Sequence, residues 1–207
     1  GSMGTLGLIL EVSLKVMPIA PATVTLRMEM DQASALAKLN EWGGQPLPLS
    51  ATCFHDGRLY VRLSGAAPAV AAAVARLGGD PVGAPEAFWS DVRDHRHAFF
   101  AVVRARGTPL WRLSVQSTSP HADLGGPQLI EWGGALRWLA AGERTDPVRV
   151  RAWAKGHGGH ATLFRGERKE GTGFAPLDEP LLTLHRKLKA VFDPQRILNR
   201  GRLIPDA

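Results

Sequence analysis

The strongest constraint on the fold is a hairpin signal in the first third of the chain. Two runs of alternating apolar residues, 49–55 and 59–64, are joined by the dipeptide Asp56-Gly57. An Asp-Gly pair between such runs is typical of a tight β-hairpin, because its turn needs positive φ at both central residues. A further alternating run at 23–30 predicts a strand ahead of the hairpin. We therefore expect an antiparallel sheet in this region.

Helix signals lie on both sides of the hairpin. Asp31 predicts the N-cap of a helix in which Leu36, Leu39 and Trp42 share one face. A second helix is predicted to begin near Pro68, since proline suits the first helical turn. The order strand, helix, hairpin, helix is ferredoxin-like.

The second half of the chain shows a comparable pattern. After a short helix near Pro85, the predicted elements are strands at 98–103 and 110–116, a hairpin formed by 129–132 and 136–140 around Gly133-Gly134, and a strand at 160–164. We therefore expect an α+β fold: an antiparallel sheet with helices packed on one face, in duplicated ferredoxin-like halves.

Two helices near the end of the chain need separate arguments. The residues 145–147, Thr-Asp-Pro, predict a helix start, although the alternation at 148–154 would also suit a strand; we favour the helix. A last helix is predicted from Asp178 to Asp193, with Lys189 on its solvated side. The charged, glycine-rich residues 167–173 predict a loop between them.

Charge and cysteine content limit the function classes. The 207 residues carry a net charge of +6, and the chain holds a single tyrosine and no aromatic series interleaved with basic residues. Because stacking platforms for nucleic acid require such a series, we expect no nucleic-acid partner, and a basic surface that attracts carboxylates or acidic proteins. The single cysteine, Cys53, is expected to be a buried thiol in a reducing compartment.

Targeting signals are not found in the sequence. No apolar run approaches the roughly 20 residues that cross a bilayer, and no charged-then-apolar leader is present, so we expect a soluble cytoplasmic protein. Residues 1–3, Gly-Ser-Met, resemble a remnant of cloning, and we expect the native polypeptide to begin further upstream.

The two ends of the chain carry its most distinctive motifs. The first is the segment 4–12, GTLGLILEV, and the second is the segment 192–202, FDPQRILNRGR. In order and spacing these segments resemble those of the flavin-linked oxidase family of vanillyl-alcohol oxidase type. The runs 110–115 and 129–139, together with the Gly-Gly-His piece at 158–162, are similar in particular to the FAD-binding subunits of glycolate oxidases.

This resemblance implies a domain organisation and a set of partners. Residues 4–18 would end a FAD-binding domain, 19–191 would form a substrate or cap domain, and 192–207 would return to the FAD-binding domain. The implied cofactor is FAD, held in the full-length protein and not tightly by this part alone. The implied partners are the N-terminal FAD-binding domain, a homologous flavin subunit, an iron-sulfur subunit and a small 2-hydroxy acid, glycolate, with a peripheral place at the inner membrane through the complex.

Oxidation of a 2-hydroxy acid needs a cationic clamp for the carboxylate and a base for the hydroxyl proton. Arginine suits the clamp because its planar fork matches a carboxylate, and Arg112 and Arg93 match family motifs. His160 is the candidate base. Each of the three also has an ordinary structural interpretation. The family motif His-x-Gly-Asp-Gly-Asn-x-His is not preserved around His160. The spacing between His157 and His160 could also suggest a metal site, but we expect none because so few other ligands lie nearby in the sequence.

The cofactor contacts implied by the resemblance lie at the two ends. They are Gly4, Thr5, Gly7, Asn199, Arg200 and Arg202. Glycine permits close backbone approach, and an asparagine side chain both donates and accepts hydrogen bonds. Packing between domains is the alternative role for all of these residues. For the whole chain, the alternative to a substrate domain is a non-catalytic scaffold that assembles the subunits of the same complex.

Overall fold

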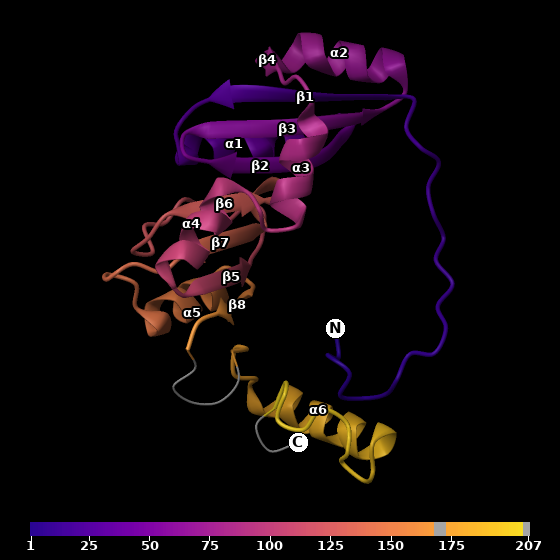
Figure 1. The fold of residues 1–207 in the computed structure, drawn as a ribbon, viewed down its shortest axis with the longest axis vertical. Coiled ribbons are helices and arrows are strands. Elements are labelled where there is room, and N and C mark those ends of the chain that lie inside the picture. The colour runs from indigo at the N-terminus through magenta and orange to yellow at the C-terminus, as the bar shows by residue number, and fades with distance from the viewer. Residues whose placement is uncertain (168–172, 205–207) are drawn as a thin grey trace. The chain divides into compact units, whose positions relative to one another are not determined.

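A computed structural model describes residues 1–167 and 173–204 and divides the chain into two compact units (Figure 1). One unit is Pro18–Gly166, and the other joins Gly1–Met17 to Glu167–Ala207. The last helix, which we placed with the substrate domain, therefore groups with the terminal segments. The assignment of the terminal segments to a FAD-binding domain stays a prediction.

In the described ranges the elements follow each other as β1 (Ala22–Glu29), α1 (Gln32–Gly43), β2 (Leu49–His55), β3 (Arg58–Gly65), α2 (Ala67–Leu77), β4 (Asp80–Pro81), α3 (Pro85–Arg93), α4 (Ala98–Arg106), β5 (Leu110–Ser114), β6 (Gln128–Glu131), the 3-10 turn η1 (Trp132–Gly134), β7 (Leu136–Ala140), α5 (Pro147–Gly156), β8 (His160–Arg165) and α6 (Glu179–Phe192). No helix in these ranges is long and apolar enough to span a membrane.

The described strands of the larger unit form one sheet in the order β4-β1-β3-β2-β6-β7-β5-β8, and every neighbouring pair is antiparallel (Figure 1). The α+β class with an antiparallel sheet is thus confirmed. From the central β2–β6 contact outward, the order is β2-β3-β1-β4 on one side and β6-β7-β5-β8 on the other. Duplication of a ferredoxin-like unit stays a prediction, which this equivalent order supports.

The predicted hairpin is present, with Asp56 and Gly57 at φ of 50° and 71° between β2 and β3. The helix after β1 begins at its predicted cap, where the Asp31 carboxylate accepts a hydrogen bond from the Ser34 amide at 2.8 Å. Local signals therefore fixed both the turn and the cap where the sequence places them.

One face of the sheet is covered by α1, α2 and α5. Leu36 and Leu39 of α1 pack with Val61 of β3 and Ile130 of β6 in one buried cluster. Ile130 lies opposite Arg137 of β7 in the register, so the two side chains share a face. On that same face, α5 packs against the neighbouring strands β5 and β7. The helix that we favoured from its start signal at 145–147 is therefore confirmed as α5, with Asp146 as its N-cap.

The other face of the sheet carries α3 and α4, which corrects the expectation of helices on one face only. Phe100 of α4 packs with Leu129 and Trp138, which alternate with the residues of the first face. The strand expected at 98–103 is wrong, because this segment is the first part of α4. Six apolar residues do not distinguish a strand from a buried helix by periodicity. Here Phe99, Phe100 and Val103 face the core at helical spacing.

The smaller unit is organised around α6. We expected Lys189 on the solvated side of this helix, but its side chain is only 4% exposed. The expected apolar face is the exposed one: Leu184 is 52% and Val191 76% exposed. The apolar residues 6–16 form no strand, since a strand needs a neighbour to satisfy its backbone groups. Of the loop expected at 167–173, residues 168–172 lie outside the described ranges.

Candidate functional site

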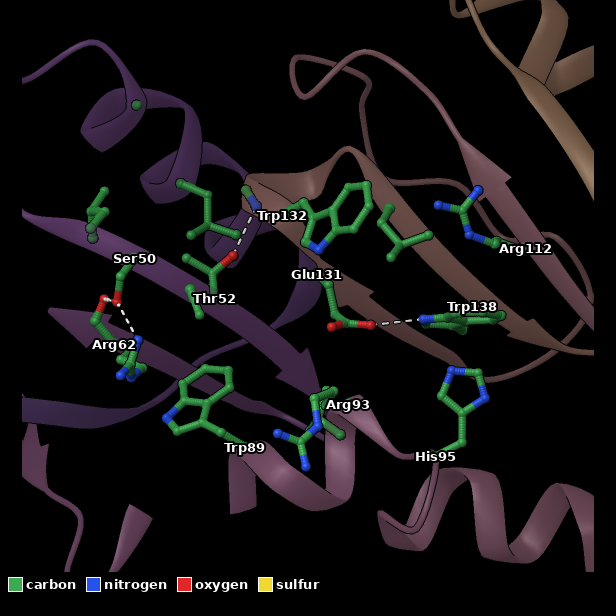
Figure 2. Close-up of a pocket in the computed structure, with 17 residues that line it drawn as sticks. Ser50, Thr52, Arg62, Trp89, Arg93, His95, Arg112, Glu131, Trp132 and Trp138 are labelled. Atoms are coloured by element: carbon green, nitrogen blue, oxygen red, sulfur yellow. Dashed lines mark hydrogen bonds between the residues drawn. The ribbon is translucent and has the colours of Figure 1, made fainter. Parts of the chain in front are cut away.

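The larger unit contains a cleft of about 720 Å³ on the sheet face that carries α3 (Figure 2). Its walls come from β2, β3, β5, β6 and β7, from turn η1 and α3, and from Leu39 and Gly43 of α1. The polar and aromatic side chains that line it are those of Ser50, Thr52, Arg62, Trp89, Arg93, His95, Arg112, Glu131, Trp132 and Trp138. Three indole rings and three guanidinium groups thus share a hollow with one carboxylate.

Glu131, the last residue of β6, places that carboxylate in the cleft. Its Oε1 accepts a hydrogen bond from the Trp138 indole Nε1 at 2.7 Å (Figure 2). Burial raises the pKa of Glu131 above its ordinary value, although the Trp138 hydrogen bond and the charge of Arg112 act in the opposite direction. The indole therefore orients the carboxylate, while the surroundings keep it a better proton acceptor than an exposed glutamate.

Arg112 lies in the middle of β5, directly opposite Trp138 of β7. Its guanidinium carbon is 5.7 Å from the ring centre of Trp132 and 6.0 Å from that of Trp138. These distances are typical of cation–π contacts, which orient a guanidinium without neutralising it. Within the described residues Arg112 forms no ion pair. Its charge is therefore available to an anion in the cleft.

Arg93 lines the same cleft but is already engaged. Its guanidinium binds the Asp94 carboxylate through two hydrogen bonds of 2.7 and 3.1 Å, and its side chain is 73% exposed. The Asp94 contact raises the pKa of Arg93, so the charge persists but is largely paired. Of the two predicted carboxylate-binding arginines, Arg112 is the better placed.

The backbone around the cleft holds two bulky residues in the left-handed region. Trp132 has φ of 53° and His95 φ of 56°. Such conformations cost of order 1–3 kcal/mol and concentrate at functional sites. Trp132 is held by its turn: the Gly133 amide donates to Thr52 Oγ1 at 2.8 Å. His95 stacks on Phe100 at a centroid distance of 4.1 Å, and burial lowers its pKa first, followed by the charges of Arg165 and Arg104.

His160 does not line the cleft. It is exposed at the start of β8 and lies opposite Ser114 of β5. The Gly-Gly-His motif has a structural reason, because a Cβ on Gly159 would lie 1.8 Å from the Ser114 carbonyl oxygen. His157 contacts the Trp153 carbonyl oxygen through Nδ1 at 2.7 Å. In the described part of the chain, no three His, Cys, Asp or Glu side chains are placed to hold a metal ion.

The smaller unit brings the two terminal motifs together around one buried ammonium group. Lys189 Nζ donates to the Thr5 carbonyl oxygen at 2.8 Å, to the Leu198 carbonyl oxygen at 2.6 Å and to Asp193 Oδ2 at 2.6 Å. Asp193 in turn accepts from the amides of Ile197 and Leu198 at 3.1 and 2.9 Å. The lysine and aspartate thus join the first and last motifs.

Asn199 and Gly4, both candidate cofactor contacts, meet in the same unit. Asn199 Nδ2 donates to the Met3 carbonyl oxygen at 2.8 Å. Gly4 has φ of 71°, and a Cβ there would lie 2.7 Å from Asn199 Nδ2. Glycine is therefore favoured at this position, because the Asn199 side chain occupies the space that a Cβ would need. The contact packs the two chain ends together, and the role of both residues toward a cofactor stays a prediction.

The other candidate cofactor contacts are less constrained. Gly7 and Arg202 are exposed. The Arg200 side chain donates to the carbonyl oxygen of Arg196 and, at 3.4 Å, to that of Gln195. Arg200 and Arg202 therefore remain candidates for a phosphate or for another domain, and nothing in the structure tests them.

Sequence reasoning missed the residues that shape both sites. Glu131, Trp132 and Trp138 appeared only as parts of a hairpin, and Lys189 and Asp193 only as parts of a helix end. One signal was available for the first group: a glutamate at the end of an otherwise buried strand, before a Trp-Gly-Gly turn. For Lys189, only its i,i+4 spacing from Asp193 gave a hint.

Two comparisons with known proteins show what the chain is similar to. Residues 166–203 match the family described as FAD linked oxidases, C-terminal domain. Over 203 residues the chain is 42% identical to glycolate oxidase subunit GlcE of Escherichia coli (strain K12). The match covers 98% of this chain and 55% of that relative, so the chain spans about half the relative's length. Over nearly its whole length the chain is therefore similar to a glycolate oxidase subunit, and residues 166–203 carry the match to the C-terminal domain of FAD linked oxidases.

Proposed function

We propose that the chain is the substrate-side domain of a FAD-dependent subunit that takes part in oxidising glycolate to glyoxylate. The observation that carries the proposal is Arg112, which has no ion-pair partner in the part of the chain that the structure describes. It contacts Trp132 and Trp138 in a cleft of a chain that is 42% identical to a glycolate oxidase subunit. A cationic fork in a partly dry, aromatic hollow suits a small carboxylate.

Each group has a defined part in the proposed chemistry. Arg112 would bind the substrate carboxylate, Trp132 would limit the space beside it, and Arg93, already paired with Asp94, would add positive potential at the rim. FAD, when bound in the full-length protein, supplies the hydride acceptor. The Gly4, Thr5 and Asn199 region would lie against that cofactor, as part of a surface shared with the FAD-binding domain. His160 stays a candidate proton acceptor, although it is outside the cleft.

The proposed assembly follows from the relative's name. GlcE is called a subunit, and we propose that this protein likewise works in a complex with a homologous flavin subunit and an iron-sulfur subunit. We also propose a cytoplasmic location, peripheral at the inner membrane through that complex. The alternative is a scaffold domain that holds these subunits without touching substrate. The missing Asp-Gly-Asn motif beside His160 favours that alternative.

The test uses the full-length subunit in its assembled complex with the substitution Arg112→Gln. Loss of a carboxylate-binding arginine should raise the KM for glycolate by about 100-fold, since hydrogen bonds between charged groups contribute about 1.5–3 kcal/mol each. The FAD content, measured by absorbance, should not change. The control is Arg58→Gln, an exposed arginine on the hairpin outside the cleft. Unchanged kinetics with intact FAD would support the scaffold and contradict the proposal.

A further inference from the structure

The cleft holds one acidic group whose role the proposed function leaves open. Glu131 uses one carboxylate oxygen to accept from Trp138 Nε1. No described residue donates to the other oxygen. A carboxylate is acceptor-only when ionised, so the second oxygen, which is not buried, is free to accept from a donor that enters the cleft. An approaching ligand with an O–H group would provide one.

Glu131 and Arg112 flank the same indole without pairing. Glu131 contacts the Trp138 ring nitrogen, and Arg112 lies over the ring 6.0 Å from its centre. The charge of Arg112 still acts on Glu131, but no ion pair within 4.0 Å joins the two groups in the described residues. The indole nitrogen orients the carboxylate, and the Trp132 and Trp138 rings orient the guanidinium, so both charged groups line the same cleft.

A cationic group and an anionic acceptor in one cleft suit one kind of ligand. A 2-hydroxy acid carries its carboxylate and its hydroxyl group on adjacent carbon atoms. Its carboxylate matches Arg112, and its hydroxyl hydrogen matches the unoccupied oxygen of Glu131. Both kinds of ligand bring a negative charge near Glu131, but a simple carboxylic acid has no donor for Glu131 and so lacks the hydrogen bond that offsets the repulsion. The cleft therefore has the means to select for the hydroxyl group.

We propose that Glu131, oriented by Trp138, recognises the hydroxyl group of a 2-hydroxy acid whose carboxylate is bound by Arg112. The inference rests on the proposed function and adds to it the residue that determines specificity. It concerns recognition of the ligand in its ground state, so it can be tested without the cofactor and without turnover.

The experiment compares the binding of glycolate with that of acetate, which differs only in lacking the hydroxyl group. Both are titrated into the 207-residue chain, and the indole N–H signals of its six tryptophans are followed by NMR. The wild type should bind glycolate at least about fivefold more tightly than acetate, because a hydrogen bond to a charged acceptor is among the stronger ones. The Trp138 signal should respond to glycolate, since Trp138 donates to the residue that changes partner.

Two substitutions isolate the role of the carboxylate. Glu131→Gln and Glu131→Met both remove the negative charge, which should strengthen acetate binding, and the preference for glycolate should fall to within about twofold. Because the loss of charge affects both anions alike, the affinity ratio reports the hydroxyl group alone. Trp138→Phe should reduce the preference without abolishing it. Glu86→Gln, an exposed carboxylate on α3 outside the cleft, is the matched control and should leave the ratio unchanged.

The outcomes separate this inference from the proposed function. Equal binding of glycolate and acetate by the wild type, or an unchanged ratio in both Glu131 variants, would overturn the role of Glu131 while leaving Arg112 as the carboxylate site. Binding of neither anion by the wild type would overturn the cleft as the substrate site, and Glu131 with it. Preserved signals of the other five indoles in each variant show that the fold is intact.

Discussion

The buried guanidinium of Arg137 offers the sharpest test of how this fold is held together. The side chain is 0% exposed, on the face of the sheet that carries α1 and α5. Its Nε donates to the Gly134 carbonyl oxygen at 3.1 Å, and Nη1 donates to that of Pro120 at 2.7 Å. A third hydrogen bond joins Nη2 to the Ser119 carbonyl oxygen. We consider the substitution Arg137→Met, which keeps most of the volume and removes all three donors.

The expected loss follows from two opposing contributions. Hydrogen bonds from a charged donor contribute about 1.5–3 kcal/mol each, so three contribute roughly 4.5–9 kcal/mol. Burial lowers the pKa of Arg137 from its ordinary value to about 10. At about 1.4 kcal/mol for each pKa unit, burying the charge costs roughly 3 kcal/mol. The difference leaves Arg137→Met destabilised by about 2–6 kcal/mol, and we expect a value near 4.

The assay is urea unfolding followed by tryptophan fluorescence. All six tryptophans lie between residues 18 and 166, so the signal reports on the larger unit. Arg137→Lys should fall between wild type and Arg137→Met, because one ammonium group cannot reach three separated carbonyl groups. Arg58→Met removes an exposed arginine and should change the free energy of unfolding by less than about 0.5 kcal/mol. An Arg137→Met protein within about 1 kcal/mol of wild type would refute the reasoning.

Three further predictions concern the glycine motif and the terminal unit. Gly159→Ala should lower the free energy of unfolding in urea by more than about 2 kcal/mol, because the new Cβ would lie 1.8 Å from a backbone oxygen of β5. The control is Gly156→Ala, whose Cβ meets no atom within 4 Å, and it should be neutral or stabilising. Lys189→Met should speed proteolytic cleavage of the C-terminal segment by at least about tenfold, and the exposed Lys187→Met should not. The hydrogen bonds of the chain to Asp193 lower its pKa from 3.8 to about 2. The contribution of Asp193 to stability is therefore complete above about pH 4 and is lost as the pH falls through 2. The NMR shifts of the Ile197 and Leu198 amides should follow this titration, and a midpoint near pH 4 would contradict the prediction.

Much of the sheet was predictable because its signals are local. The Asp56-Gly57 turn and the caps at Asp31 and Asp146 each depend on two or three neighbouring residues, and the structure confirms all of them. The wrong prediction of a strand at 98–103 also came from reliance on local signals. That segment is apolar throughout, and only packing of Phe100 against Trp138, 38 positions later in the chain, decides for a helix.

The candidate site was only partly predictable, because its geometry depends on contacts between distant segments. Arg112 was found from its position in a motif, but nothing near it in the sequence indicates that Trp132 and Trp138 would flank its charge. Glu131 was missed because it becomes a site residue only through its bond to Trp138. Lys189 was assigned to solvent because helical periodicity cannot report that Thr5, 184 positions earlier, would accept its hydrogen bond.

The sheet register connects the structural arginine to the arginine of the proposed site. Arg112 lies opposite Trp138, and Leu113 lies opposite Arg137, on adjacent antiparallel strands. Because successive side chains alternate between faces, Arg137 is buried on one face while Arg112 enters the cleft on the other. A slip of one residue in β7 would move Arg137 to the cleft face and Trp138 into the helix-covered core, removing the indole that both Arg112 and Glu131 use. The three hydrogen bonds that hold Arg137 therefore act on the site as well as on stability: they make the correct register the only one in which a buried guanidinium finds its acceptors. Substitutions at Arg137 should accordingly weaken glycolate binding even though this side chain never reaches the cleft, and an Arg137→Lys protein that folds fully and binds glycolate as tightly as the wild type would show that the register is fixed by other contacts.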